Sequence, residues 1–407
     1  MKFAHMSDVH IGGWKEPKLR ELNLMSFKKA IDICINENVA FLLISGDLFN
    51  TALPQIEYIK EVSHVLSKLK EFDISVYIIP GSHDFSPSGK TMIDVLDKAG
   101  LMENVFKFEN GKLSFTIDKT NAKITGIIGQ RTGLEREHYK KLDKESLEKE
   151  DGFKIFMFHT LISELKPSFL DKVEGEGLDS LPKGFDYYAG GHPHFVFNEK
   201  IKDYGIITYP GALFPNNFME LERFHHGGFF IVDVNNEVNV KHVPVKFYDV
   251  VNLNINVDGK TSNEANNFIL NELDKDVSNK IVTLRIHGVL SNWKLSDIDW
   301  KQINNKLIDS YIFLKNISKL TTKDYEELRI EGGDIEDIEN KVIKENLGKI
   351  KIDNEEIIIH NILNSLNIEK GEGERNSDFE ERIAKNFVKV FNLEEIWKWI
   401  LINLSEV

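Results

Sequence analysis

Short apolar runs alternate with segments of helical periodicity from residue 1 to about residue 245, and glycine or proline separates many of them. Apolar runs bounded by turn-forming residues predict buried strands; they lie at residues 2–6, 41–45, 75–79, 124–128, 154–158, 187–189, 206–209 and 228–233. Apolar positions three and four residues apart predict helices over residues 23–37, 55–70 and 91–98. Helices alternate with strands at first and strands dominate later, which indicates an α/β fold with two stacked sheets flanked by helices.

The pattern changes after residue 246. Residues 247–330 predict a small α+β unit: a strand in VVNLNINV, a helix near residues 261–274, a strand at residues 280–287 and a helix from residue 298. Residues 331–377 carry the acidic run EGGDIEDIEN and the glycine-rich run KGEGERNSD, which predict a solvated helix and a flexible linker. We therefore expect domains over residues 1–246 and 247–330, a linker over residues 331–377, and a helical segment over residues 378–407.

The last thirty residues become apolar again. Their apolar positions are Phe379, Ile383, Phe387, Val390 and Phe391, followed by Ile396, Trp397, Ile400 and Leu401. The spacing predicts two short helices, divided at Asn392. They could pack on their own chain as a helical hairpin or bind a partner protein. The glycine-rich tether before them and their aromatic content favour the partner.

Composition and charge narrow the classes of protein that fit. The chain has 407 residues, of which 41% are hydrophobic, so it can bury a sizeable core. Its net charge is −14, from 51 Lys and Arg against 65 Asp and Glu, and both halves are acidic. The sequence therefore shows no basic arm or tail of the kind that indicates a polyanionic partner. Any contact with nucleic acid must be local, assisted by metal ions, or helped by another subunit.

The cysteine count and the N-terminal residues bear on the compartment. Cys34 is the single cysteine and lies in an apolar helical stretch, so neither a disulfide framework nor a thiolate zinc cluster can form within one chain. Asp8 and His10 stand where a signal peptide would need an apolar run, and no segment approaches eighteen uninterrupted apolar residues. We expect a cytoplasmic protein with no membrane segment.

Five short segments place metal-binding side chains at the ends of predicted strands. They contribute Asp8 and His10, Asp47, His83 and Asp84, His159, and finally His192 and His194. Side chains on loops that leave strand ends can meet above a sheet, where rigid strands fix the ligand geometry. Carboxylate and imidazole without thiolate suit manganese, iron or zinc. The set predicts a site for two divalent ions, bridged by Asp47, that hydrolyses a phosphate ester.

Each segment alone has a structural interpretation. An isolated D-x-H or G-D sequence more often forms a turn or a helix cap than a metal site. An H-x-H sequence on a strand points both histidines to the same side, which is suggestive only. The ordered set of five, each after an apolar strand, favours a metal site over five unrelated turns.

The ordered motifs D-x-H, G-D, G-[N]-H-[DE], H and G-H-x-H resemble those of the calcineurin-like metallophosphoesterases, with the match spanning Asp8 to His194. The resemblance implies an α/β fold, namely a four-layer α/β/β/α metallophosphoesterase sandwich with a small α+β capping domain and C-terminal helices. The segments FAHMSDVHIGG, LLISGDLFN and FDYYAGGHPH are most similar to the double-strand-break repair nucleases of the meiotic-recombination-eleven type, called SbcD in bacteria. Residues 247–330 would then be the DNA-contacting cap.

The resemblance also implies roles for single residues. One metal ion would be held by Asp8, His10, Asp47 and His194, and the other by Asp47, Ser82, His159 and His192. His83 resembles a histidine that is no ligand but contacts the scissile phosphate or protonates the leaving oxygen, and Asp84 would orient it. The family usually has asparagine where this chain has Ser82. A hydroxyl reaches less far than an amide oxygen, so the second ion would be held through a water or more weakly.

The resemblance implies a Mn²⁺-dependent DNA nuclease with two metal ions, acting as a 3′–5′ exonuclease on duplex DNA and an endonuclease on single strands. It would work in double-strand-break repair as a homodimer, with a coiled-coil zinc-hook ABC-type ATPase bound through the C-terminal helices. Two other interpretations stay open. A phosphoesterase of other substrates would use the same chemistry but needs no extra domain or terminal helices. A scaffold subunit would have lost the second ion through Ser82.

Overall fold

The computed structural model describes residues 1–86, 91–130, 136–273, 275–291, 298–322, 355–366 and 376–390. The chain divides into two compact units. The first comprises Met1–Ile255, Asn267–Ile286 and Asp299–Ser318, and the second comprises Asn256–Asn266, His287–Ile298 and Lys319–Val407. Within the described ranges, no helix is long and apolar enough to cross a membrane.

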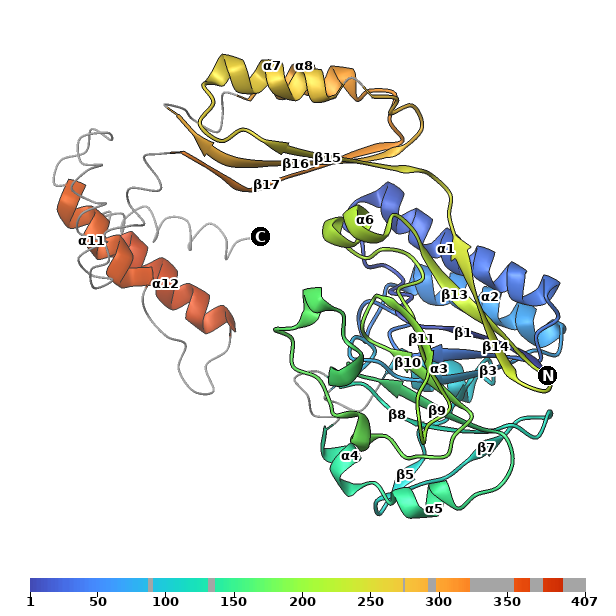
Figure 1. Ribbon diagram of the computed structural model, residues 1–407. Coiled ribbons are helices and arrows are strands. Elements are labelled where there is room, and N and C mark those ends of the chain that lie inside the picture. The colour runs from blue at the N-terminus through green and yellow to red at the C-terminus, as the bar shows by residue number, and fades with distance from the viewer. Residues whose placement is uncertain are drawn as a thin grey trace. The chain divides into compact units, whose positions relative to one another are not determined.

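The first sheet of the first unit has six strands (Figure 1). In order across the sheet they are β14 (Val238–Val245), β13 (Gly227–Val234), β1 (Lys2–Met6), β2 (Phe41–Ser45), β3 (Ser75–Ile79) and β4 (Glu103–Asn104). The strands from β1 to β4 are parallel, whereas β13 and β14 run antiparallel to their neighbours. The C-terminal ends of β1, β2 and β3 therefore meet at one edge.

The second sheet also has six strands. In order they are β11 (Val196–Lys200), β12 (Ile206–Pro210), β10 (Tyr187–Gly191), β9 (Lys154–His159), β8 (Lys123–Ile127) and β7 (Thr116–Ile117). The four central strands β12, β10, β9 and β8 are parallel, and β11 and β7 pair antiparallel at the two edges. A separate two-stranded sheet pairs β5 (Phe108–Glu109) with β6 (Lys112–Leu113).

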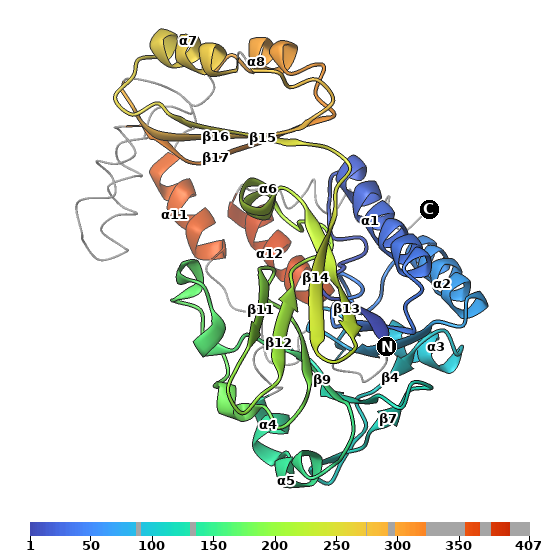
Figure 2. The same cartoon turned by 45° about the vertical axis from the view of Figure 1, so that its right-hand side comes forward.

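Helices cover the outer faces of both sheets. The first sheet packs against α1 (Pro17–Asn36), α2 (Ile56–Glu71) and α3 (Met92–Lys98), and α1 and α2 lie side by side in both views (Figures 1 and 2). The second sheet packs against α4 (Arg136–Lys141) and α5 (Lys144–Glu148), and the 3₁₀ turns η2 (Ser163–Leu165), η3 (Ser168–Leu170) and η4 (Leu178–Ser180) follow β9. Helix α6 (Phe218–Phe224) precedes β13.

Three apolar clusters define the layers. Phe3 and Phe41 from the first sheet pack with Tyr187 and Met157 from the second, and the rings of Phe3 and Phe41 stack with centroids 4.9 Å apart. The outer face of each sheet packs against its helices in a separate cluster, and Cys34 on α1 is a buried member of one of them. Apolar side chains on both faces explain why the central strands are largely apolar in the sequence. The predicted four-layer α/β/β/α sandwich is confirmed.

The later residues form a three-stranded sheet in the order β15 (Val250–Asn256), β16 (Ile281–Leu290) and β17 (Ile312–Thr322), with α7 (Ser262–Glu272) and α8 (Trp300–Lys306). The sequence predicted a helix from residue 298 and no third strand. The helix ends at Lys306, and β17 follows it.

The C-terminal part contains α11 (Glu355–Leu366) and α12 (Asn376–Val390). The predicted apolar positions Phe379, Ile383, Phe387 and Val390 fall on α12. The predicted break at Asn392 and the apolar positions beyond it lie outside the described residues. The expected domain boundaries and the role of this segment stay predictions.

Candidate metal centre

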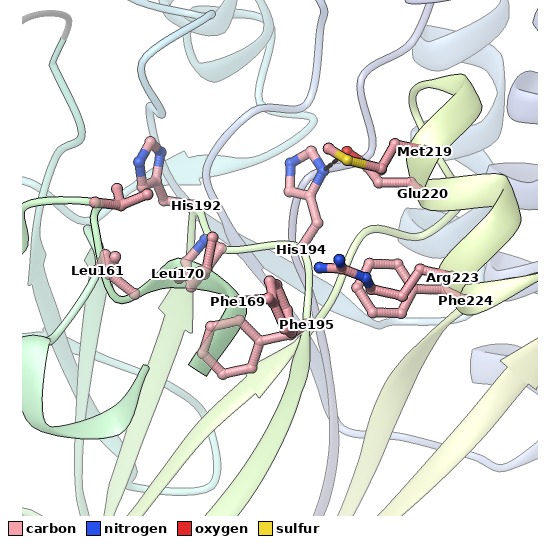
Figure 3. Close-up of a pocket in the computed structure, with 12 residues that line it drawn as sticks. Leu161, Phe169, Leu170, His192, His194, Phe195, Met219, Glu220, Arg223 and Phe224 are labelled. Carbon is pink, nitrogen blue, oxygen red and sulfur yellow. Dashed lines mark hydrogen bonds and ion pairs between the residues drawn. The ribbon is translucent and has the colours of Figure 1, made fainter. Parts of the chain in front are cut away.

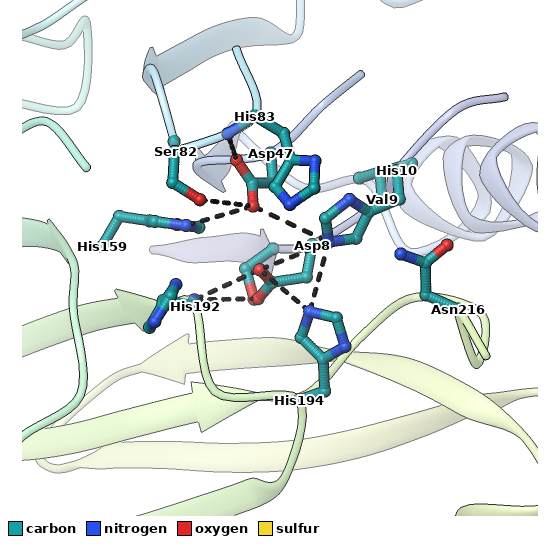
Figure 4. A network of polar contacts seen from close by, with 12 residues as sticks. Asp8, Val9, His10, Asp47, Ser82, His83, His159, His192, His194 and Asn216 are labelled. Atoms are coloured by element: carbon teal, nitrogen blue, oxygen red, sulfur yellow. Dashed lines mark hydrogen bonds and ion pairs between the residues drawn. The ribbon is translucent and has the colours of Figure 1, made fainter. Parts of the chain in front are cut away.

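All five predicted segments meet at one edge of the sandwich (Figure 4). Asp8 and His10 follow β1, Asp47 follows β2, Ser82, His83 and Asp84 follow β3, His159 ends β9, and His192 and His194 follow β10. Within each sheet the strands that carry these residues are parallel to one another, so their C-terminal ends deliver the side chains to the same place. The convergence that the strand-end spacing predicted is therefore present.

The loops that carry these residues turn sharply. Asp8, His10, Asp47 and His192 have φ angles of 52°, 48°, 52° and 91°, in the left-handed region that non-glycine residues rarely adopt. Such residues cost of order 1–3 kcal/mol each and gather at functional sites. Gly46 has a φ of 90°, and a Cβ there would lie 2.1 Å from His159 Nδ1. Glycine is thus required for β2 to approach the histidine of the other sheet.

The carboxylates of Asp8 and Asp47 stand between the imidazole rings. Asp47 Oδ2 lies 3.3 Å from His159 Nε2 and 3.7 Å from His10 Nε2. Asp8 Oδ1 lies 3.5 Å from His194 Nε2 and 3.9 Å from His10 Nε2. The Nε2 atoms of His10 and His194 are 3.2 Å apart. Several nitrogen and oxygen atoms therefore face a small common space, as ligands of a shared cation do.

The outer nitrogens of two rings fix which atoms face this space. His159 Nδ1 lies 2.8 Å from the Ser45 carbonyl oxygen and His194 Nδ1 lies 2.9 Å from Glu220 Oε1. Both partners accept hydrogen bonds, so both Nδ1 atoms donate and, in the neutral rings, the lone pairs are on Nε2. His159 Nε2 is buried with no hydrogen-bond partner in the described part of the chain. In the neutral ring, the lone pair of His159 Nε2 faces the Asp47 carboxylate, and the two repel each other unless a proton or a cation lies between them. A divalent ion at this position would accept both as ligands.

Asp8, Asp47, His10 and His192 are in the charge states that bind a metal ion. Burial lowers the pKa of His10 and of His192 to about 4. Burial also opposes the charged form of His159, but the Asp47 carboxylate outweighs it and raises the pKa of His159 to about 9. The pKa values of Asp8 and Asp47 stay below the usual range despite burial, because histidines surround both carboxylates. Ionised carboxylates and neutral imidazoles are the forms that bind metals, so a metal ion at His159 would have to displace a proton.

Three groups of residues have ligand atoms that all lie within 4.8 Å of one another: Asp8, His10 and His194; His10, Asp47 and His83; and Asp8, Asp47 and His159. His192 is in none of these groups. Ser82 Oγ donates to Asp47 Oδ2 at 3.4 Å. The His192 backbone N–H donates to the Asp8 carboxylate at 3.1 Å, and its ring centroid lies 5.3 Å from that of His159. Both are thus beside the centre, and their assignment as ligands stays a prediction.

His83 and Asp84 lie as neighbours but do not interact as expected. The His83 backbone N–H donates to Asp47 Oδ1 at 2.7 Å, and its ring Nδ1 lies 2.8 Å from the Asn50 carbonyl oxygen. The buried Asp84 carboxylate accepts hydrogen bonds from the backbone N–H groups of Leu48, Phe49 and Gly81, at 3.0–3.1 Å. Burial and the nearby Asp47 charge raise the pKa of Asp84 to about 7. Asp84 therefore holds the two loops together, and Asn50 orients the His83 ring.

Three residues orient the histidines of the site but could not be identified from any local sequence pattern. Ser45 and Asn50 act through their backbone carbonyl oxygens, which every residue type has. Glu220 lies on α6, 26 positions after His194, and no spacing relates the two. Burial opposes the ionised form of Glu220. The hydrogen bond from the His194 ring outweighs burial and keeps the pKa of Glu220 below its usual value.

Residues 1–195 match the family model described as calcineurin-like phosphoesterase. Two relatives have names that are more specific than the description of the family model. The chain is 27% identical to the DNA double-strand break repair protein Mre11 of Methanocaldococcus jannaschii, over 84% of this chain and 93% of that protein. The protein of that name from Methanococcus maripaludis is also 27% identical, over 84% of this chain and 91% of its own length. A solved dimetal phosphatase from Danio rerio has a TM-score of 0.39 and 10% identity, covering 60% of this chain and 98% of that one.

Proposed function

We propose that this chain is a metal-dependent DNA nuclease that processes broken ends in double-strand-break repair. The proposal depends on one observation: carboxylate and imidazole groups from five strand ends face one small space, with the Nε2 atoms of His10 and His194 3.2 Å apart. Such donor sets serve phosphate ester hydrolysis with two metal ions. The substrate is inferred from relatives that match most of the chain and are named for double-strand-break repair.

We propose Mn²⁺ as the working metal, which is one of the ions that suit carboxylate and imidazole donors without thiolate. The residues that would hold the two ions are Asp8, His10, Asp47 and His194 for one, and Asp47, Ser82, His159 and His192 for the other. When bound, such a pair lowers the pKa of a water and neutralises charge on the phosphate in the transition state. The chain's own contribution is placement, because the left-handed loop residues and the hydrogen bonds to Ser45 and Glu220 hold the rings in fixed orientations.

His83 is the residue we assign to proton transfer. The Asn50 carbonyl only accepts, so Nδ1 of His83 keeps its hydrogen and Nε2 is the nitrogen that can exchange a proton with the substrate. When protonated, Nε2 would donate to the leaving oxygen as its bond to phosphorus breaks. Asp84 would act as a positioning residue through the backbone, because it joins the loop of Asp47 to the loop of His83.

The proposal includes 3′–5′ exonuclease activity on duplex DNA, endonuclease activity on single strands, a homodimer, and a coiled-coil zinc-hook ABC-type ATPase. Residues 378–407 would bind the ATPase, and residues 247–330 would contact DNA. The net charge of −14 supports a partner, because affinity for DNA depends largely on Lys and Arg that neutralise phosphates. The helical spacing of Phe379 and Ile383 on α12 supports a helical binding element.

The test is cleavage of labelled linear duplex and single-stranded DNA by the purified chain with Mn²⁺, Mg²⁺ or chelator. We expect Mn²⁺-dependent cleavage that is lost in Asp47→Ala, because Asp47 contacts both halves of the site. Asp32→Ala is the matched control, since this carboxylate lies on α1 and pairs with Lys68 at the surface. Calorimetric titration should show that Asp47→Ala loses metal binding and that Asp32→Ala keeps it.

Three results would overturn the proposal in different ways. Equal cleavage by wild type and Asp47→Ala would remove the site from the chemistry. Hydrolysis of simple phosphate esters without any cleavage of DNA would make the chain a phosphoesterase of other substrates. A chain that binds one ion and hydrolyses neither substrate would be a scaffold subunit.

A further inference from the structure

A cavity of about 320 Å³ opens beside the metal centre and shares two of its histidines (Figure 3). His192 and His194 line it together with Phe169, Phe195, Phe224 and Arg223. In Figure 3, residues of the segment that follows β9 lie on one side and residues of α6 lie on the other, with His194 between them. Whatever occupies this cavity therefore touches side chains that also border the proposed site of hydrolysis.

The walls of the cavity are largely aromatic. The rings of Phe169 and Phe195 meet edge to face, with centroids 6.4 Å apart and an angle of 89° between their planes. Phe169 is 45% exposed and Met219 is 58% exposed, so apolar surface faces solvent at the rim. Ligand pockets of this kind combine apolar walls with a few polar groups. The polar groups here are the two histidines, Glu220 and Arg223.

Arg223 supplies a cation that no carboxylate neutralises in the described part of the chain. Its guanidinium carbon lies 3.8 Å from the centroid of the Phe169 ring. The ring fixes the plane of the guanidinium without consuming its five N–H donors. In a chain of net charge −14, such a cation beside the metal centre favours a ligand that carries negative charge or hydrogen-bond acceptors.

We propose that this cavity binds one unpaired nucleobase of the DNA substrate, next to the phosphate that the metal centre would hydrolyse. The inference rests on the proposed nuclease function and refines it. An aromatic and guanidinium wall is the surface on which proteins stack bases of single strands. A paired base in duplex DNA is stacked on its neighbours and cannot enter unless it is extruded. The cavity therefore selects single-stranded or frayed DNA at the point of cleavage.

Abasic DNA tests this proposal. A labelled single-stranded oligonucleotide and the same strand with one abasic residue are cleaved with Mn²⁺, and the products are resolved to single nucleotides. We expect the wild type to cleave one phosphate next to the abasic residue about 5- to 150-fold more slowly, the factor that corresponds to the stacking of one base. Cleavage elsewhere on the strand should not change.

Phe169→Ala and Arg223→Ala should cleave intact single strands more slowly by a similar factor and should no longer discriminate against the abasic residue. Both side chains are exposed, so the substitutions should leave the core intact. Phe72→Ala is the matched control, because Phe72 is 56% exposed at the end of α2 and lines no part of this cavity. Phe169→Tyr should retain the discrimination.

If the wild type cleaves equally fast next to the base and next to the abasic residue, the proposed base pocket is wrong. The proposed nuclease function is unaffected by that result. Abasic discrimination that persists in both Phe169→Ala and Arg223→Ala would also overturn it. If the wild type cleaves no DNA, the proposed nuclease function fails, and the base pocket fails with it.

Discussion

Glu220 should determine how tightly one side of the metal centre binds a divalent ion. Its Oε1 accepts from His194 Nδ1 at 2.9 Å, and its Oε2 accepts from the Asn216 backbone N–H at 2.8 Å. The Glu220 side chain is 13% exposed, so little water competes for these bonds. The carboxylate fixes the His194 tautomer, leaves Nε2 as the atom that would bind the ion and makes that nitrogen more basic. Its removal leaves the ring free to rotate and to change tautomer.

The expected loss follows from these contacts. Removing a carboxylate that orients a ligating histidine typically costs about 10–100-fold in metal affinity, which we expect for Glu220→Ala. Glu220→Gln keeps an acceptor for Nδ1–H but loses the charge. Charged and neutral hydrogen bonds differ by about 1 kcal/mol, so this variant should lose about 5-fold. The two variants thus separate orientation from charge.

The pH dependence adds a second readout. Burial lowers the pKa of His194, but Asp8 and Glu220 outweigh it, so the net pKa is well above the usual value. Protons therefore compete with the metal for Nε2 in the wild type, and they compete less when Glu220 is absent. The difference in affinity between wild type and Glu220→Ala should narrow as the pH falls.

Isothermal titration calorimetry with Mn²⁺ on the metal-free chain, repeated at several pH values, measures both effects. Glu61→Ala is the matched control, because Glu61 lies on α2 and pairs with Lys28 rather than with a histidine of the site. Circular dichroism checks that each variant is folded. An Mn²⁺ affinity of folded Glu220→Ala equal to that of the wild type would refute the assigned role.

Two further substitutions test the remaining site residues. His83→Ala should keep metal binding but slow DNA cleavage by about 100-fold or more, because it removes the proton donor; single-turnover cleavage measures this, and an unchanged rate would exclude His83 from the chemistry. Ser82→Asn should tighten the weaker of two Mn²⁺ titration steps, because an amide oxygen is a better neutral ligand than a hydroxyl; a titration identical to that of the wild type would mean that residue 82 is no ligand.

The central strands and the meeting of the candidate ligands at one place could be predicted from the sequence for the same reason. Strands β1, β2 and β3 are buried along most of their length, so most of their residues are apolar and their bounds are those predicted. The polar residues that follow such runs are short-range signals, and parallel pairing brings the ends of different strands together. The order of the motifs along the chain therefore specified a site that spans two sheets.

The edges of the fold and the supports of the site could not be predicted in this way. Strand β11 is exposed along most of its length, so VFNEK has no apolar pattern that marks a strand. Strand β17 has Leu314, Ile317 and Leu320 three positions apart, so its sequence lacks the alternation of apolar and polar residues that marks a strand. Glu220 and the carbonyls of Ser45 and Asn50 act through tertiary contacts. A single sequence contains no local pattern for such contacts.

Residues of helix α6 make contacts with three segments that lie far apart in the sequence. Glu220 orients His194, Glu222 bonds Arg285 on β16, and Arg223 stacks on Phe169 in the cavity beside the metal centre. These residues occupy one helical turn, so a shift of the helix would move all three contacts together. The Asn252 amide also donates to the Glu222 carbonyl oxygen, at 2.6 Å. The geometry of the metal ligand and the shape of the proposed base pocket therefore depend on how α6 is held by β15 and β16.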